Sequence, residues 1–198
     1  MLYRVWGIIV LLAFYGCYFA KAASQRKKGI TTDQMGKGKT GAVRTIEITM
    51  KVATVLTGTV GVISVLLGTT ALPDGLRTLG ACAGLAGAGV FVASVVTMKD
   101  SWRAGVPKED KTELVTDGIY RISRNPAFLG FDLVYLGVAL MFFNWALFAA
   151  SVFAATMLHV QIVKVEEPFL LSVFGEEYAA YSRGVCRYIG RKRIKKDA

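Results

Sequence analysis

Residues 133–163 read LVYLGVALMFFNWALFAASVFAATMLHVQIV, a run of 31 residues without Lys, Arg, Asp or Glu. Extended back to Ala127 across Asp132, the run reaches 37 residues. One straight helix of that length would be about 55 Å long, whereas the hydrocarbon core of a bilayer is about 30 Å thick. We therefore predict that residues 127–163 form a helical hairpin that turns near residues 144–145 and crosses the membrane twice.

Three further uncharged runs lie upstream of this hairpin, at residues 5–20, 52–72 and 78–98. The second and third hold 21 residues each, enough for one membrane-spanning helix apiece. The first holds 16 and can still span if Arg4 and Lys21 extend their charged ends to the two interfaces. The sequence therefore predicts an all-α integral membrane protein with about five transmembrane helices.

The composition agrees with this prediction. Hydrophobic residues make up 54% of the chain and charged residues only 19%, yet the formal net charge is +10. Such a composition excludes an intrinsically disordered chain and is unusual for a soluble domain. Apolar runs separated by basic segments are typical of a multi-spanning membrane protein.

The positive charges predict the orientation. Of the 24 Lys and Arg residues, 22 lie in the segments 21–51, 99–126 and 164–198, which five spans place on one side of the membrane. Because basic loops stay in the cytoplasm, we expect the C-terminus inside, the N-terminus outside, and a flexible basic cytoplasmic loop over residues 21–51. A signal peptide cleaved near residues 20–22 would put that segment outside, against the charge rule.

Small residues recur at four-residue spacing in the third run, at Gly80, Gly84 and Ala88. They share one helix face, and such faces let two helix backbones approach closely. We expect this face to pack within the chain, with a dimer face as the alternative. The oligomeric state is not predicted.

Two polar stretches flank the hairpin. Residues 112–130 read TELVTDGIYRISRNPAFLG, and residues 166–181 read EEPFLLSVFGEEYAAY. A hairpin returns the chain to the face that it left, so we expect these stretches to be neighbours on the cytoplasmic side. Tyr120 and Phe128 would supply aromatic faces for an adenine ring or a sulfonium.

The charged residues of these stretches suggest a ligand site. Pro126 suits the first turn of a helix, whose free N–H groups beside Arg124 would favour an anion such as a carboxylate. Glu166 and Glu167 offer acceptors for a cation or an amine. The alternative is that these residues only anchor helix ends or form a solvated pair. No metal site is expected, because Cys17, Cys82, Cys186 and His159 lack metal-ligand spacing.

In order and spacing, the two stretches resemble the isoprenylcysteine carboxyl methyltransferases and the related phospholipid methyltransferases of membranes. That pattern is His-x-Leu-Val, Gly-[Ile/Val]-Tyr, Arg-His-Pro-x-Tyr-x-Gly, a hairpin, Glu-Glu and Phe-Gly-x-Glu-Tyr-x-x-Tyr. The chain departs from it in three places: Thr112 and Asn125 replace His, and Phe128 replaces Tyr. In addition, Ile162 stands where the eukaryotic enzymes have an Arg four residues before the Glu that matches Glu166.

The resemblance implies a cytoplasmic site for S-adenosyl-L-methionine (SAM) within residues 99–198, which would be the catalytic region, whereas residues 1–98 would supply three helices. The cofactor contacts that it implies are Thr112, Glu113, Leu114, Val115, Tyr120, Asn125, Pro126, Ala127, Phe128 and Glu166. For catalysis we expect Arg124 to orient a carboxylate acceptor, or Glu167 to act as the base for an amine acceptor.

The implied function is SAM-dependent methylation of a lipophilic substrate that enters from the bilayer. O-methylation of an isoprenylcysteine-like carboxylate and N-methylation of a phospholipid amine are both open. A non-catalytic membrane protein of the same fold is a further alternative. No nucleic-acid partner is expected, because the basic tail carries no reading motif and cytoplasmic orientation already accounts for its charge.

Overall fold

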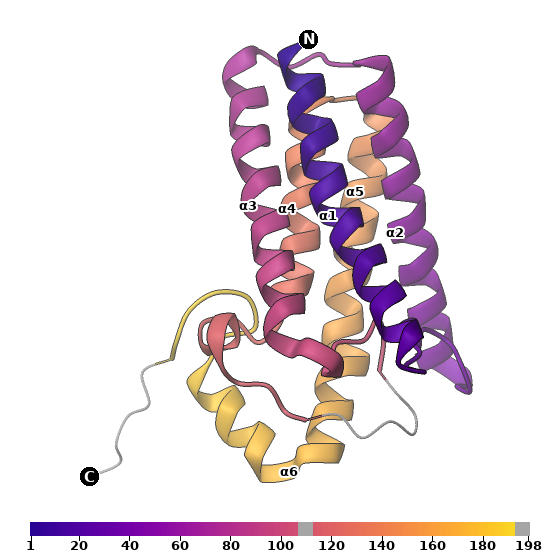
Figure 1. Ribbon diagram of the computed structural model, residues 1–198, viewed down its shortest axis with the longest axis vertical. Coiled ribbons are helices and arrows are strands. Elements are labelled where there is room, and N and C mark those ends of the chain that lie inside the picture. Colours follow the sequence, from indigo (N-terminus) through magenta and orange to yellow (C-terminus); the bar gives the residue numbers. More distant parts are fainter. Residues whose placement is uncertain (107–112, 193–198) are drawn as a thin grey trace.

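The chain folds into a bundle of long helices, and the computed structural model describes residues 1–106 and 113–192. In chain order the elements are α1 (Leu2–Lys27), α2 (Gly41–Leu67), α3 (Asp74–Met98), the 3₁₀ turns η1 (Lys99–Ser101) and η2 (Gly118–Arg121), α4 (Pro126–Met141), α5 (Trp145–Gln161), the π-helical turn η3 (Ile162–Glu166) and α6 (Glu167–Gly184). Figure 1 shows α1 to α5 running along one another, with α6 bending away at one end. The predicted all-α membrane fold is confirmed.

The apolar helices are long enough to cross a membrane. By length and composition α1, α2, α3 and the stretch from Trp145 to Gly184 qualify, and α4 is a shorter apolar helix. The stretch from Trp145 to Gly184 has 40 residues, but it is not one straight helix, because the backbone of Gly175 is non-helical (φ 51°, ψ −124°) and kinks α6. We expect α5 to be the membrane-spanning part of this stretch, with Ile162 and the residues after it beyond the end of the span.

The hairpin predicted for residues 127–163 is confirmed as α4 and α5, joined by residues 142–144. Asn144 ends the turn and caps α5, because its side chain accepts a hydrogen bond from Leu147 N at 2.9 Å. The amide nitrogen of Asn144 donates to Ser64 Oγ at 2.8 Å, which ties the turn to α2. The turn thus lies where the sequence predicts it.

The small-residue face of α3 packs against α4. A Cβ added at Gly80 would come within 2.7 Å of Gly137 O, and one added at Gly137 would lie 2.4 Å from Gly84 N. Farther along, a Cβ at Gly87 would come within 2.9 Å of Gly130 O. Larger residues would force the two backbones apart, so the expected packing within the chain is confirmed.

The α1–α2 connection is shorter than the predicted loop over residues 21–51, because α1 continues to Lys27 and α2 already begins at Gly41. The remaining connection is hydrogen-bonded to the chain that follows η1. Gln34 N donates to Ala104 O at 2.8 Å, and Ala104 N donates to Thr32 O at 2.9 Å. A fully buried Gln25 links Thr32 to the carbonyl of Trp102. We call residues 30–36 with 102–106 the pinned cap.

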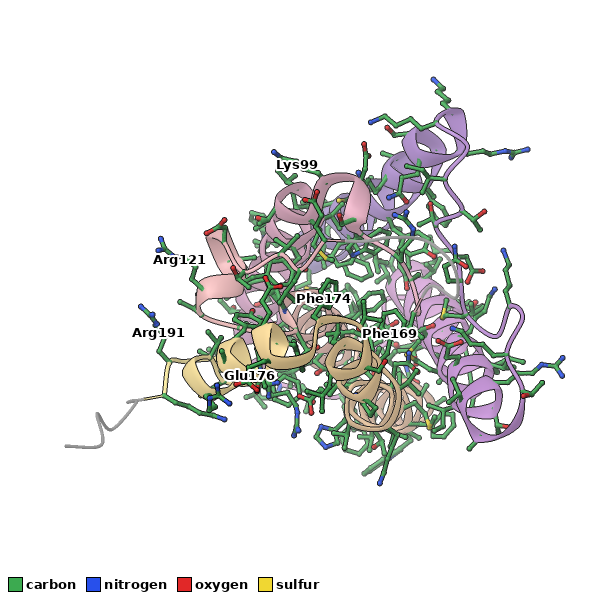
Figure 2. The ribbon with its side chains drawn as sticks, turned by 90° about the horizontal axis from the view of Figure 1, so that it is seen from below. Lys99, Arg121, Phe169, Phe174, Glu176 and Arg191 are labelled. Atoms are coloured by element: carbon green, nitrogen blue, oxygen red, sulfur yellow. The ribbon has the colours of Figure 1, made fainter. Side chains whose placement is uncertain are left out.

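The basic segments gather at one end of the bundle. Figure 1 shows the N-terminus, the α2–α3 connection and the α4–α5 turn at the opposite end from α6. Figure 2 looks onto the α6 end and shows Lys99, Arg121 and Arg191 pointing outward from its edge. The basic segments thus share one end of the bundle, as the charge pattern predicts.

Candidate active site

A cavity of about 760 Å³ lies between α1, α2 and the start of α4. Leu12 and Phe19 of α1 and Val55 of α2 line it, and their exposed fractions are 68, 63 and 62%. Side chains that line a cavity and are also this exposed mark its lateral opening. Both α1 and α2 are long and apolar enough to cross a membrane, so the opening lies between two candidate membrane-spanning helices.

The inner end of the cavity is formed by residues of the two motif stretches. Ala127 and Phe128 line it from the first turn of α4, and Glu166 lines it from the end of η3. The first turn forms here because Pro126 occupies the start of α4, where a missing N–H removes no helix bond. The structure thus brings together three of the predicted cofactor residues.

The π-helical turn η3 determines what lies beside Glu166. A π turn places residues five apart on the same face, so Glu166 lies next to Gln161. Gln161 is fully buried, and its amide lies close enough to Glu166 to lower the pKa of that carboxyl, but neither amide atom completes a hydrogen bond of standard geometry among the described residues. A buried amide without partners is costly, and such a group is typical of a place where a ligand binds.

The electrostatics of Glu166 suit a group that changes charge near neutral pH. Burial raises the pKa of its carboxyl from 4.5 to about 7, the Gln161 amide lowers it, and the charges of Glu47 and Lys39 raise and lower it respectively. Tyr120 of η2 is buried nearby: burial raises the pKa of its phenol, and the Glu166 carboxylate raises it further. Tyr120 is therefore the fourth predicted cofactor residue at this site, after Ala127, Phe128 and Glu166.

Sequence reasoning missed the contribution of the N-terminal half. Glu47 of α2 is fully buried and accepts hydrogen bonds from Lys39 Nζ, Gly36 N at 2.7 Å and Val106 N at 3.3 Å. Glu47 thus connects α2 to both segments of the pinned cap, residues 30–36 and 102–106, at the inner end of the cavity. The available signal was the single acid of α2, which lies near the start of that helix.

Arg124 and Glu167, the predicted catalytic pair, meet each other in an ion-pair network. Arg124 Nη2 lies 3.0 Å from Glu167 Oε1, and Arg187 makes two bonds to the same carboxylate at 2.9 and 2.8 Å. Arg124 Nη1 also donates to the hydroxyl of Tyr178 at 2.9 Å. Neither Arg124 nor Glu167 is among the residues that line the cavity.

The network changes the acidity of Glu167. Burial alone would raise the pKa of its carboxyl, but the Arg187 hydrogen bonds and the charges of Arg124 and Arg187 outweigh burial and hold it below the ordinary value. A carboxylate held in this way binds protons weakly at neutral pH. The catalytic roles of the pair stay predictions, and the geometry favours an anchoring role.

The tail after α6 packs against the first motif stretch. Arg124 N donates to Cys186 O at 3.1 Å, and Gly190 N donates to Ile122 O at 2.7 Å. The side-chain amide of Asn125 donates to Arg187 O at 3.1 Å, so the residue that replaces the family His contacts the tail. No motif in the sequence predicts this docking.

The remaining predicted cofactor residues have mixed positions. Thr112 lies outside the described residues. Glu113 is exposed, Leu114 and Val115 are half-buried, and Pro126 is buried. The structure therefore places Tyr120, Ala127, Phe128 and Glu166 at one site, and it does not bring Glu113 to them.

A comparison with protein families covers this same region. The model described as phospholipid methyltransferase matches residues 76–177, just over half of the chain. The chain belongs to the phospholipid methyltransferase family. This family match confirms the family predicted from the motifs; it includes Tyr120 and Glu166 and leaves Glu47 outside.

Curated relatives of this family member match it over shorter stretches. A protein-S-isoprenylcysteine O-methyltransferase of Tribolium castaneum is 27% identical over 112 residues, 56% of this chain and 40% of the relative. The enzymes of that name from Schizosaccharomyces pombe and Saccharomyces cerevisiae are 33% identical over 72 residues and 32% over 78, covering 36% and 39% of this chain and 30% and 33% of theirs. The chain thus matches 40% or less of the length of these relatives.

Proposed function

We propose that this family member is a membrane methyltransferase that uses SAM to methylate the carboxylate of a lipophilic acceptor. The observation that carries the proposal is the cavity, which leads from a lateral opening between α1 and α2 to Ala127, Phe128 and Glu166. An apolar acceptor can enter from the bilayer, while the polar end holds the residues that the family resemblance assigns to the cofactor. The names of the relatives support O-methylation of an isoprenylcysteine-like substrate.

The residues at the inner end fit such a cofactor. Glu166 offers a carboxylate for a cationic group, and Phe128 and Tyr120 offer aromatic faces. The described buried side-chain atoms without a hydrogen-bond partner include both amide atoms of Gln161, five residues before Glu166. A polar group of a cofactor bound beside Glu166 would supply the partner that this amide lacks.

When bound, SAM supplies an electrophilic methyl group on a sulfonium. The protein then has to hold the acceptor in line with that methyl group and keep water away. A carboxylate acceptor is already a nucleophile at neutral pH, so orientation is sufficient. The apolar walls of the cavity exclude water from it.

N-methylation of a phospholipid amine is the second candidate, and the pKa of Glu166 favours it. An amine must lose a proton before it attacks, and a carboxyl with a pKa of about 7 is well matched to accept one. In this version Glu166 takes the role of base that the sequence assigned to Glu167.

Labelled methyl transfer tests the proposal. Membranes that contain the chain are incubated with methyl-labelled SAM, and the lipids are extracted. We expect label that mild base releases, as from an ester; label stable to base in a phospholipid head group would select N-methylation. No transfer, together with no binding of SAM to the purified protein, would indicate a non-catalytic member of the family.

We also propose that the α6 end faces the cytoplasm, as the charge pattern requires. Lys37 at that end and Asp74 at the other are both exposed. In a background whose native cysteines are replaced by Ser, we expect Asp74→Cys to react with an impermeant thiol reagent in intact cells and Lys37→Cys to stay unlabelled. The reverse pattern would invert the topology.

A further inference from the structure

One side chain in the wall of the cavity crosses from α1 to α2. Tyr15 of α1 places its phenol against the backbone of Gly58 on α2, where an added Cβ would overlap the Tyr15 hydroxyl and lie 3.1 Å from Cζ. Both residues line the cavity. We call Tyr15 packed on Gly58 the wall contact. A larger residue at position 58 would leave the phenol no room in its present position.

A second and much smaller void, of about 10 Å³, lies on the other side of the wall contact. Tyr15 and Gly58 line this void too, together with Val134, Val138 and Leu147 of the α4–α5 hairpin, which are buried in the core of the bundle. A void of this volume holds about one water molecule at most. The wall contact thus separates the open cavity from the packed core.

Neighbouring side chains hold the phenol of Tyr15 in this position. The ring of Phe14 packs edge-on against it, with 5.1 Å between the ring centroids. The hydroxyls of Tyr15 and Tyr135 interact through a hydrogen bond, and the Tyr135 hydroxyl also donates to Thr54 O on α2 at 3.4 Å. Core neighbours therefore occupy one side of the Tyr15 ring, and the cavity lies on the other.

The wall contact lies partway along the cavity. The face of α2 that lines the cavity runs from Met50 to Ile63, about 20 Å at about 1.5 Å per residue. Gly58 lies about 12 Å from Met50 on this scale. An extended hydrocarbon chain that starts at the inner end therefore passes Gly58 at about its tenth carbon, because each carbon adds about 1.25 Å.

We propose that Tyr15, packed on Gly58, determines how wide an apolar chain the cavity accepts about 12 Å from its inner end. The inference rests on the proposed function, in which the apolar part of the acceptor occupies the cavity, and it adds a residue that selects that chain. Tyr15 and Gly58 both precede residues 76–177, the stretch that matches the family. Selection of the chain thus depends on α1 and α2 and not on the motif stretches.

Two neutral spin-labelled probes test the wall contact without a cofactor or a charged head group. Methyl 10-doxylstearate carries a bulky ring at the depth of Gly58, and methyl 16-doxylstearate carries the same ring farther along the chain. Electron paramagnetic resonance of the purified chain in mixed micelles measures how much of each probe is immobilised. We expect the wild type to bind the 10-doxyl ester about tenfold more weakly than the 16-doxyl ester, because the wall contact leaves no room for the ring. Tyr15→Leu joins the void to the cavity and should remove the difference.

Gly58→Ala tests the same contact from the other helix. The added methyl group overlaps the Tyr15 hydroxyl, and the void behind the ring is too small to receive it, so the ring has to move into the cavity. We expect binding of the 16-doxyl ester to weaken by about tenfold, the effect of removing about two methylenes from contact. Tyr15→Phe removes the overlapping atom and should restore binding when combined with Gly58→Ala. Gly16→Ala, whose added methyl group meets no described atom within 4 Å, is the control.

Equal binding of the two esters by the wild type would overturn the inference, as would a binding defect in Gly58→Ala that Tyr15→Phe does not relieve. Unfolding of the same variants by sodium dodecyl sulfate measures their stability. If Gly58→Ala lowered stability and left the binding of both esters unchanged, Tyr15 would serve packing alone and the inference would be wrong. SAM titrations of the same proteins keep the two proposals apart. Selection between the esters without SAM binding would overturn the methyltransferase and leave the role of Tyr15 intact.

Discussion

Glu166 and Glu167 are adjacent in the chain, yet they lie in two regions with opposite electrostatics. Glu166 lines the cavity, and burial raises the pKa of its carboxyl to about 7. Glu167 lies in the network with Arg124 and Arg187, which holds its pKa below the ordinary value although burial opposes this. Neighbouring residues on a helix point about 100° apart, so one carboxyl reaches each region.

The difference assigns separate tasks to the two regions. A carboxylate shared by two guanidinium groups joins α6, the tail and the start of α4, which is an anchoring task. A carboxyl with a pKa near neutrality beside a cavity is available for a ligand. The predictions below test this division, beginning with the largest expected effect.

Breaking the network should destabilise the fold. In Glu167→Ala, Arg124, whose side chain is only 9% exposed, stays buried without its carboxylate. Removing one partner of a buried ion pair lowers the free energy of unfolding by about 3 kcal/mol. Unfolding by sodium dodecyl sulfate in mixed micelles measures the loss.

An exposed ion pair on the same helix supplies the control for this experiment. Glu176 pairs with Arg183, and both side chains are largely exposed. Glu176→Ala should therefore lower the free energy of unfolding by less than about 1 kcal/mol. Similar losses in the two variants would contradict an anchoring role for Glu167.

Removing the charge at the cavity should weaken the cofactor instead. We expect Glu166→Gln to lower SAM affinity by about 10- to 100-fold, because a charge-assisted hydrogen bond contributes about 1.5–3 kcal/mol. Glu167→Gln should leave SAM affinity nearly unchanged while lowering stability. Calorimetric titration of both variants makes the comparison, and a reversed ranking would move the cofactor site to the network.

The pH dependence should distinguish the same two carboxyls. Glu166 is neutral below a pH of about 7, so SAM, which carries cationic groups, should bind about tenfold more tightly at pH 8 than at pH 6. Glu166→Gln should remove this dependence. A wild-type affinity that is flat between these values would show that Glu166 does not contact a cationic group of the ligand.

Stability should follow the opposite signs of the two shifts. The pKa of Glu166 is raised in the folded protein, so its contribution to stability falls as the pH rises from about 4.5 to about 7. The pKa of Glu167 is lowered, so its contribution is present above the ordinary pKa and is lost as the pH falls through the folded value. Glu166→Gln and Glu167→Gln should each remove the part of the pH dependence of stability that its own carboxyl contributes.

The sequence predicts the membrane helices well, because the forces that determine them are local. A run of 37 residues with one acid cannot be a single span, and Asn144 marks the turn between α4 and α5. Gly80 and Gly84 reveal a close helix contact by their spacing alone, although not that Gly137 is the partner.

The site is less predictable, because its decisive contacts are between distant segments. From the sequence, only the family resemblance separates Glu166 from Glu167. In the structure, the π turn and the docking of Arg187 separate them in space. In the sequence, Glu47 and Lys51 resemble ordinary polar residues at the end of a membrane helix. Only the structure shows that the pinned cap contacts both of them.

The smallest expected effect concerns the contact that connects the two regions. The hydroxyl of Tyr181 on α6 donates to the carbonyl of Tyr120 at 2.6 Å, and the phenol of Tyr120 lies beside Glu166. Tyr181→Phe removes this hydrogen bond and should lower the free energy of unfolding by about 1 kcal/mol. Because hydrogen bonds within η2 also hold Tyr120 in place, SAM affinity should fall by no more than about threefold.

Tyr188→Phe, which removes a partly exposed hydrogen bond to His159 on α5, supplies the control and should leave SAM affinity unchanged. A loss of SAM affinity in Tyr181→Phe as large as in Glu166→Gln would mean that α6 positions the cofactor site directly, and the two regions would then have to be treated as one.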